Sequence, residues 1–140
     1  MLHLSRAVLT AALAVLVAGC VTTDAARLST STAYRPPVPP GYVSLYRTPG
    51  QVPRPYEEIA LLSSSGDVDF TDQASMIESM RQKAGELGAN GIILETIEEP
   101  SPGAEVAAAI FGVLVNRKGK AIAIWVFPAG AHGADPIRHH

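Results

Sequence analysis

The sequence predicts an α+β fold, with a mostly antiparallel sheet of about four strands and one long helix packed on it. Residues 72–87 carry apolar side chains at helical spacing, whereas residues 92–97 and 121–127 are short apolar segments rich in β-branched residues. A chain of 140 residues is long enough for one such domain with tails at its ends.

The segment 72–87 has the clearest helical pattern. Gly88 follows the segment directly, and a glycine fits the left-handed backbone position that ends a helix. Thr71 or Asp72 can cap the first amide groups, and Gly85 weakens the helix relative to alanine, so we expect close packing there. The apolar residues that recur every three or four positions, and that we expect on the buried face, are Ala74, Ile77, Met80, Ala84 and Leu87.

Two segments before this helix are predicted as strands. Residues 42–46 alternate aromatic with small or polar residues and end at the turn Thr48-Pro49-Gly50. Residues 59–63 form the second strand, and we expect Ser64-Ser65-Gly66 to close it as a turn.

Two further strands follow the helix. Gly91 leads into residues 92–97, which start as a strand buried on both faces. Residues 121–127 carry apolar side chains on both faces, so we expect this strand at the centre of the sheet. Either the sheet is covered twice or one face meets another subunit.

Residues 106–115 are ambiguous. Residues 106–111 can form a short helix, and residues 113–115 can pair with residues 121–124 through a hairpin at 116–120. The segment is too short to cross a bilayer. We expect it to be buried in protein, with a contact to lipid as the alternative.

The N-terminus has the pattern of an export signal. A short positive start precedes the apolar residues 7–17, which are too few to span a bilayer. Val17-Ala18-Gly19-Cys20 resembles the lipobox of bacterial lipoproteins, in which the cysteine thiol receives a diacylglyceryl group and the chain is cut before it. We therefore predict a signal peptide at 1–19 and lipidation of Cys20. An ordinary secreted protein with one thiol near its terminus is the alternative.

The remaining chain divides into three parts. Residues 20–41 are rich in Ser, Thr, Ala and Pro and are predicted to be a lipidated tether, with a proline-rich docking ligand as the alternative. Residues 42–128 form the small α+β domain, and residues 129–140 a flexible tail. Val21 follows the cysteine where enterobacterial lipoproteins retained in the inner membrane have Asp, so a periplasm-facing outer-membrane location is favoured.

Charge argues against binding to nucleic acid, because the net charge is −2 and phosphates call for a clustered basic surface. The longest basic cluster is Arg117, Lys118 and Lys120, beside a glycine. We interpret it as a solvated hairpin tip.

No residue pattern indicates catalysis, a cofactor or a metal. Ser63–Ser65 lack a nucleophile motif, and the domain contains no histidine. Asp67, Asp69 and Asp72 lack the later ligands of a calcium loop and are expected to cap the helix or solvate a loop. We expect a solvated rim from Glu95, Glu98 and Glu99, and no fixed metal site from the tail residues His132, His139 and His140.

Three segments in order, residues 56–62, 83–94 and 119–126, resemble the domain shared by YbjQ-like proteins and the RcsF-like stress-sensing lipoproteins. The resemblance covers residues 42–127, and its most specific part is Ala84–Leu94. It implies strands beside one long helix. RcsF-like proteins imply envelope surveillance through protein partners, and YbjQ-like proteins imply ring-shaped oligomers and heavy-metal binding. The disulfide-forming cysteines of the RcsF-like proteins are absent here.

These observations predict a lipid-anchored, non-catalytic module of the cell envelope that binds or senses another envelope protein, or self-associates. Its attachment to the membrane is through Cys20. The alternative is a protein that binds a small molecule or a metal, or an enzyme with an unrecognised site.

Overall fold

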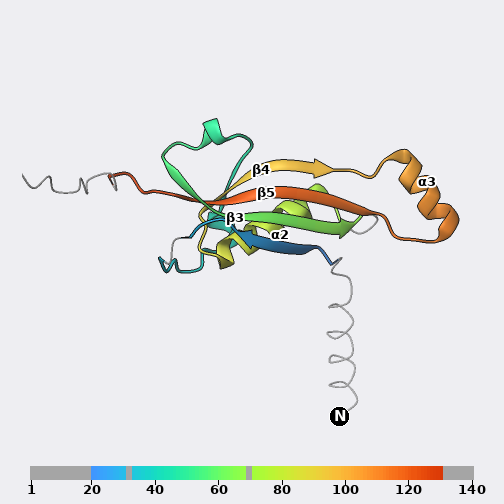
Figure 1. The fold of residues 1–140 in the computed structure, drawn as a ribbon, viewed down its shortest axis with the longest axis horizontal. Helices are drawn as coiled ribbons and strands as arrows, with labels where there is room; N and C mark the ends of the chain where they lie inside the picture. Colours follow the sequence, from blue (N-terminus) through green and yellow to red (C-terminus); the bar gives the residue numbers. More distant parts are fainter. Residues whose placement is uncertain (1–19, 31–32, 69–70, 131–140) are drawn as a thin grey trace, which may run out of the picture.

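The computed structural model describes residues 20–30, 33–68 and 71–130. These residues form a mixed five-stranded sheet in the order β1-β3-β5-β4-β2, with helix α2 (Gln73–Glu86) on one face and helix α3 (Pro102–Phe111) beyond one end (Figure 1). The predicted α+β fold, with a helix packed on a sheet, is confirmed. The other elements are β1 (Thr22–Arg27), β2 (Ser44–Tyr46), β3 (Tyr56–Asp67), β4 (Gly91–Glu98), β5 (Asn116–Val126) and the short 3-10 helices η1 (Pro40–Tyr42) and η2 (Pro49–Gln51).

Strand β5 lies at the centre of the sheet, as its two apolar faces predict. It pairs antiparallel with β3 on one side and with β4 on the other. Strand β1 adds antiparallel to β3 at one edge, and β2 adds parallel to β4 at the other. The predicted strand at 42–46 is shorter than expected, because residues 40–42 form η1 and only residues 44–46 pair with β4.

Strands β3 and β5 extend further than the sequence predicts. The expected turn at Ser64-Ser65-Gly66 is wrong, because these residues continue β3 and pair with residues 117–119 of β5. The expected hairpin at 116–120 is wrong for the same reason, since these residues belong to β5 itself. A long backbone ladder holds these polar residues in the sheet, although they carry no apolar pattern.

The predicted tether is also wrong, since residues 22–27 are the edge strand β1. Its backbone pairs with β3 from Thr22 opposite Ser65 to Arg27 opposite Ala60. The Thr23 hydroxyl lies 2.7 Å from that of Ser79 on α2. An edge strand needs backbone partners more than an apolar face, so composition alone did not identify it.

The residues after β1 pack on the domain as well. The guanidinium of Arg35 lies 2.5 Å from a Glu57 carboxylate oxygen and 5.8 Å from the ring centre of Trp125. Val38 donates its amide to the carbonyl of Gly85 at 2.9 Å, and a Cβ on Gly85 would collide with the Val38 carbonyl. The close packing expected at Gly85 is therefore confirmed. Cys20 is separated from the first strand by one residue, with no spacer between them.

Helix α2 begins and ends as predicted. The Asp72 carboxylate accepts the Ser75 amide at 2.7 Å, and Gly88 has a positive φ of 80° after the last turn. The buried face differs from the expected one, because Ala74 is exposed and Ile77 and Leu87 are only half-buried. The buried residues of α2 are Met76, Met80, Ala84 and Gly85.

The reason for the shifted face is a close approach of α2 to β5. A Cβ on Gly119 would lie 2.5 Å from the Met80 methyl carbon and 3.2 Å from that of Met76. Glycine in the central strand thus creates the space that the two methionines fill. The apolar residues of the helix are compatible with two overlapping faces, and only the sheet decides between them.

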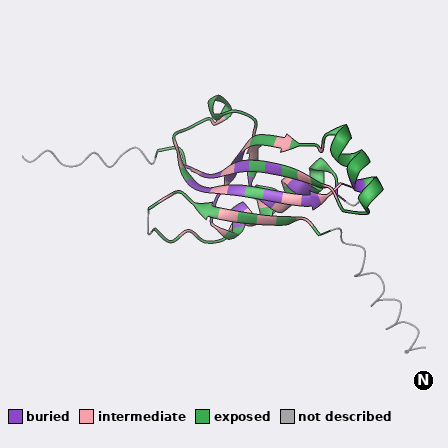
Figure 2. Cartoon of the chain, turned by 45° about the vertical axis from the view of Figure 1, so that its right-hand side comes forward, coloured by how far each residue is buried: buried purple, intermediate pink, exposed green. Residues whose placement is uncertain are grey.

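The two faces of the sheet are covered unequally. Buried residues concentrate in the central strands (Figure 2). The main core lies between α2 and the sheet, whereas a smaller cluster of Ile93, Ile124 and Val126 lies on the other face. Tyr46, Val52 and Tyr56 cover this second cluster. The remaining part of that face is open to solvent.

Candidate functional site

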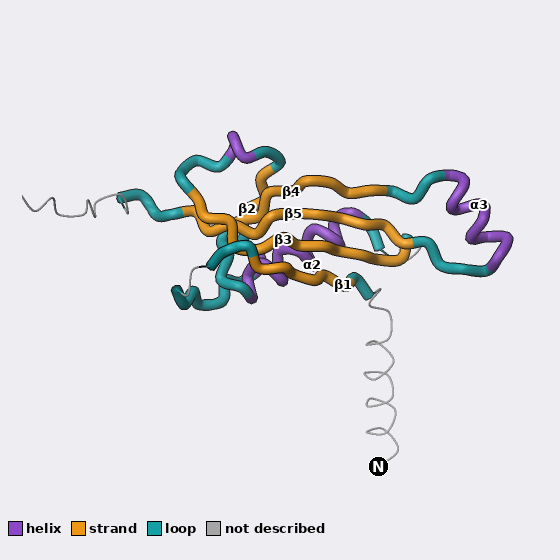
Figure 3. Tube along the Cα trace, in the orientation of Figure 1, coloured by secondary structure: helices purple, strands orange, loops and turns teal. Residues whose placement is uncertain are grey.

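One end of the sheet brings together features that lie far apart in the sequence. We call it the Cys20 end, because β1 and β5 begin there and β3 and β4 end there. Thr22 pairs with Ser65 near the end of β3, and Cys20 precedes Thr22 by two residues. Helix α3 projects beyond the same end, joined to β4 and β5 by loops (Figure 3).

The predicted lipidation residue is accessible. Cys20 is exposed at the start of the described chain, directly before the edge strand. An acyl group on this thiol would therefore leave the domain from the Cys20 end.

Helix α3 is well formed at both ends. The Ser101 hydroxyl accepts the Ala104 amide at 3.3 Å, Pro102 follows at a position where its missing N–H costs nothing, and Gly112 closes the helix with φ 66°. The helix predicted at 106–111 is confirmed, but residues 113–115 are not a strand. The expected burial is wrong, because Ala108 is the only buried residue of α3.

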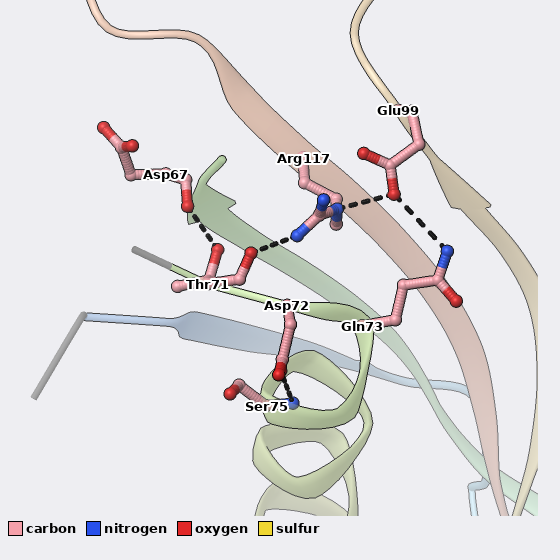
Figure 4. Close-up of polar contacts among 7 residues, drawn as sticks. All are labelled: Asp67, Thr71, Asp72, Gln73, Ser75, Glu99 and Arg117. Carbon is pink, nitrogen blue, oxygen red and sulfur yellow. Dashed lines mark hydrogen bonds and ion pairs between the residues drawn. The ribbon is translucent and has the colours of Figure 1, made fainter. Parts of the chain in front are cut away.

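A polar cluster ties the Cys20 end together (Figure 4). Arg117 at the start of β5 donates from Nε to Oε1 of Glu99 at 2.7 Å and from a terminal nitrogen to the carbonyl of Thr71. Gln73 donates to the same Glu99 oxygen at 3.4 Å, and Thr71 donates its hydroxyl to the carbonyl of Asp67 at 2.5 Å. The contacts join β3, the start of α2, β5 and the segment after β4.

The electrostatics of this cluster favour its charged forms. Hydrogen bonds from Ser75 lower the pKa of Asp72, and the hydrogen bond from Arg117 lowers the pKa of Glu99. The same bond to Glu99 raises the pKa of Arg117. Each group is therefore held in its ordinary ionised state, which suits a structural tie and gives no group prepared to exchange a proton near neutral pH.

The structure places Arg117 and Glu99 differently from what the sequence predicted. Arg117 does not belong to a solvated hairpin tip, since it lies in β5 with a side chain that is 15% exposed. Glu99 has a basic partner, contrary to the expectation of a simple solvated rim. Asp72 caps the helix as expected, whereas Asp69 lies outside the described residues.

The part of the sheet face that faces away from α2 carries an open polar surface. Met80 faces Gly119 and Thr23 reaches Ser79, so the neighbouring residues in these strands point to the other face. A shallow cavity of about 530 Å³ lies there. We call this surface the open polar face; it comprises Thr22, Asp24, Ser63, Ser65, Thr96, Glu98, Lys118 and Lys120.

The other candidate residues do not form a chemical site. Ser63–Ser65 lie within β3, where Ser64 is buried and bonded to Thr23. Among the described residues, no group of three or more His, Cys, Asp or Glu is placed to hold a metal ion. His132, His139 and His140 lie outside the described residues. No helix in the described part of the chain combines the length and apolarity needed to cross a membrane.

Comparison with known proteins adds one structural neighbour. No family model matches the chain. No curated protein matches it either. A solved structure, titled as a crystal structure of the Francisella virulence factor FvfA in the orthorhombic form, aligns with a TM-score of 0.47 at 16% identity over 73% of this chain and 97% of that one.

Sequence reasoning missed the ion pair of Arg117 with Glu99 and the exposure of α3. The two charged residues are 18 positions apart and meet only because β4 and β5 pair antiparallel. No sequence signal indicated the exposure of α3, because its apolar composition favoured burial.

Proposed function

We propose that this chain is a lipoprotein of the bacterial cell envelope, anchored by acyl chains on Cys20 and facing the periplasm. The observation that carries the proposal is Val17-Ala18-Gly19-Cys20 behind an apolar segment of export-signal length. The exposure of Cys20, directly before the folded domain, supports it. Two or three acyl chains on one residue attach a protein stably to a bilayer. Val21 favours the outer membrane.

The test of anchoring is the replacement Cys20→Ala. The variant lacks the acyl acceptor, so we expect an uncut precursor and no mature acylated form, measured by mass spectrometry of the membrane fraction. Ser29→Ala provides the control, because it removes a hydroxyl but leaves the cleavage site intact. A mature Cys20→Ala protein of unchanged size in the membrane fraction would contradict the proposal.

We further propose that the domain acts by binding another envelope protein rather than by catalysis. The open polar face is the surface that supports this role. It lies on the sheet around a shallow cavity and presents two carboxylates and two ammonium groups, with Glu98 opposite Lys118. Mixed charges of this kind fix the register of a bound partner and the specificity of its recognition, and they add less to the affinity. The resemblance to RcsF-like proteins points to the same role.

A charge reversal tests this surface. We expect the full chain to retain a reproducible partner from envelope extracts, and the double variant Lys118→Glu, Lys120→Glu to lose it. Gln82→Glu on the exposed side of α2 changes charge without touching the open polar face and should keep the partner. Recovery of no reproducible partner, together with a monomeric protein, would exclude the role.

A small-molecule ligand is the second candidate, because the cavity of about 530 Å³ falls in the size range of ligand sites. A ligand that binds only the native state raises its stability, by about 2.7 kcal/mol at a hundredfold excess over Kd. A thermal shift that is lost in the Lys118→Glu, Lys120→Glu variant would favour this candidate over a protein partner.

A further inference from the structure

Helix α3 and the turn after it expose a large apolar surface. Val106, Ile110, Phe111, Val113 and Leu114 have exposed fractions between 59 and 77%. We call these five residues the apolar tip. Isolated exposed apolar residues are common on proteins, but five on adjoining turns form a continuous patch of the kind that marks a contact surface.

The helix presents these side chains in one direction. At about 100° per residue, Val106, Ile110 and Phe111 fall within about 140° of one another around the axis. Glu105, the helix's charged residue, lies on the opposite side, and Ala108 is the buried contact to the domain. The apolar side of α3 therefore points away from its charged residue and from its buried residue, and it is available to contact a lipid layer.

The position of the apolar tip indicates which surface it contacts. It projects from the Cys20 end, where one residue separates Cys20 from β1 (Figure 1). Two residues extend at most about 7 Å, so an acylated Cys20 would hold this end of the sheet at the lipid surface. We propose that the apolar tip inserts into the same lipid leaflet that holds the acyl chains of Cys20. This inference rests on the proposed lipid anchor.

The composition of the tip favours lipid over a protein partner. It holds Val, Ile, Leu and Phe, and none of the Trp, Tyr or Arg residues that dominate protein interfaces. Helix α3, with 10 residues, is about 15 Å long, too short to span the hydrocarbon layer. It therefore lies along the surface. Its charged residue is a single glutamate, Glu105, so apolar burial and not charge carries the contact.

Two attachment points have a consequence for orientation. An acyl anchor alone leaves a domain free to tilt, whereas a second contact nearby becomes intramolecular and is made at high effective concentration. The domain would then stand on its Cys20 end. The opposite end, with β2 and η2, would point away from the membrane (Figure 1).

A depth measurement on the full lipidated chain tests the inference. Acylation consumes the thiol of the chain's single cysteine, so a second cysteine can be labelled selectively. We would attach an environment-sensitive fluorophore at Phe111→Cys and, as the matched control, at Gly50→Cys. Gly50 is exposed in η2 with open space around it. Each protein is reconstituted in vesicles of phosphatidylethanolamine and phosphatidylglycerol with brominated acyl chains.

We expect several-fold stronger bromine quenching at position 111 than at position 50, insensitive to added salt. Equal, weak quenching at both positions in a preparation whose mass shows acylated Cys20 would overturn the inference and leave the anchor standing. A blue shift at position 111 without quenching would overturn it in favour of a second copy or another protein. An unmodified Cys20 in a chain that does not float with vesicles would overturn both proposals.

A second pair of variants separates insertion from misfolding. Ile110→Glu with Leu114→Glu should return the quenching at position 111 to the level of position 50, with an unchanged thermal melt, because both side chains are more than two-thirds exposed. Ala107→Ser with Ala109→Ser, a milder change in the same helix, should keep the strong quenching. Strong quenching that survives the double Glu change would contradict insertion of the tip.

Discussion

Helices α2 and α3, the two α-helices of the described residues, differ in opposite ways in composition and burial. Helix α2 carries Glu78, Arg81, Lys83 and Glu86, yet it packs on the sheet and contributes four buried residues to the fold. Helix α3 has one charged residue and is mostly apolar, yet just one of its ten residues is buried (Figure 2). Apolar content therefore does not decide which helix enters the core.

Topology decides instead. Helix α2 returns along the sheet between β3 and β4, so its methionine face meets Gly119 on the central strand. Helix α3 connects two strands that already pair with each other, and it leaves the sheet at its end. The apolar surface of α3 is thus available for something other than folding.

The largest expected effect comes from the buried face of α2. Met80→Ala removes a fully buried side chain against Gly119 and should cost about 2–5 kcal/mol in the free energy of unfolding. In a domain of this size, each kcal/mol lowers the melting temperature by about 4–8 °C. Gln82→Ala on the exposed side of the same helix is the control. Equal melting temperatures for the two variants would mean that α2 does not pack as described.

A somewhat smaller effect is expected where the segment after β1 crosses α2. Gly85→Ala would bring a methyl group against the Val38 carbonyl, so the segment must shift, at a cost of about 1–3 kcal/mol. Gly50→Ala, in open space, is the matched control and should change the denaturation midpoint little. If Gly85→Ala were as stable as wild type, residues 33–41 would not be packed on the domain.

How much of this could be predicted from the sequence depends on which contacts define each element. Helix α2 and the central position of β5 follow from local spacing and from apolar residues on both faces of one strand. Strand β1 could not be predicted, because its residues Thr22–Arg27 are held by backbone bonds to β3 and by the Thr23 hydroxyl. The outward direction of α3 could not be predicted either, because it depends on the pairing of β4 with β5.

The polar cluster at the Cys20 end should make a modest, pH-dependent contribution. The folded-state pKa of Glu99 and of Asp72 is lowered, so their stabilisation is present above their unfolded values of about 4 and is lost as the pH falls through the folded values. Glu99→Gln should therefore show a shallower loss of stability below about pH 5 than wild type, measured by thermal melts across the acid range. Parallel acid limbs for the two proteins would exclude the role of Glu99.

The smallest effect on stability is expected in α3. Ile110→Ser replaces a side chain that is 71% exposed and should change the free energy of unfolding by no more than about 0.5 kcal/mol. The difference in unfolding free energy between Ile110→Ser and Met80→Ala would show that α2 stabilises the fold and that α3 does not. A loss of stability comparable to that of Met80→Ala would show that α3 belongs to the core.

The intact mass of the mature protein from membranes tests the lipid anchor most directly. We expect a chain that begins at Cys20 and carries a diacylglyceryl group on its thiol, with or without a third acyl chain on its amino group. Peptide mapping should place the added mass on Cys20. A chain that begins at another residue, or one whose Cys20 carries an unmodified thiol, would contradict the lipid anchor and with it the membrane contact of α3.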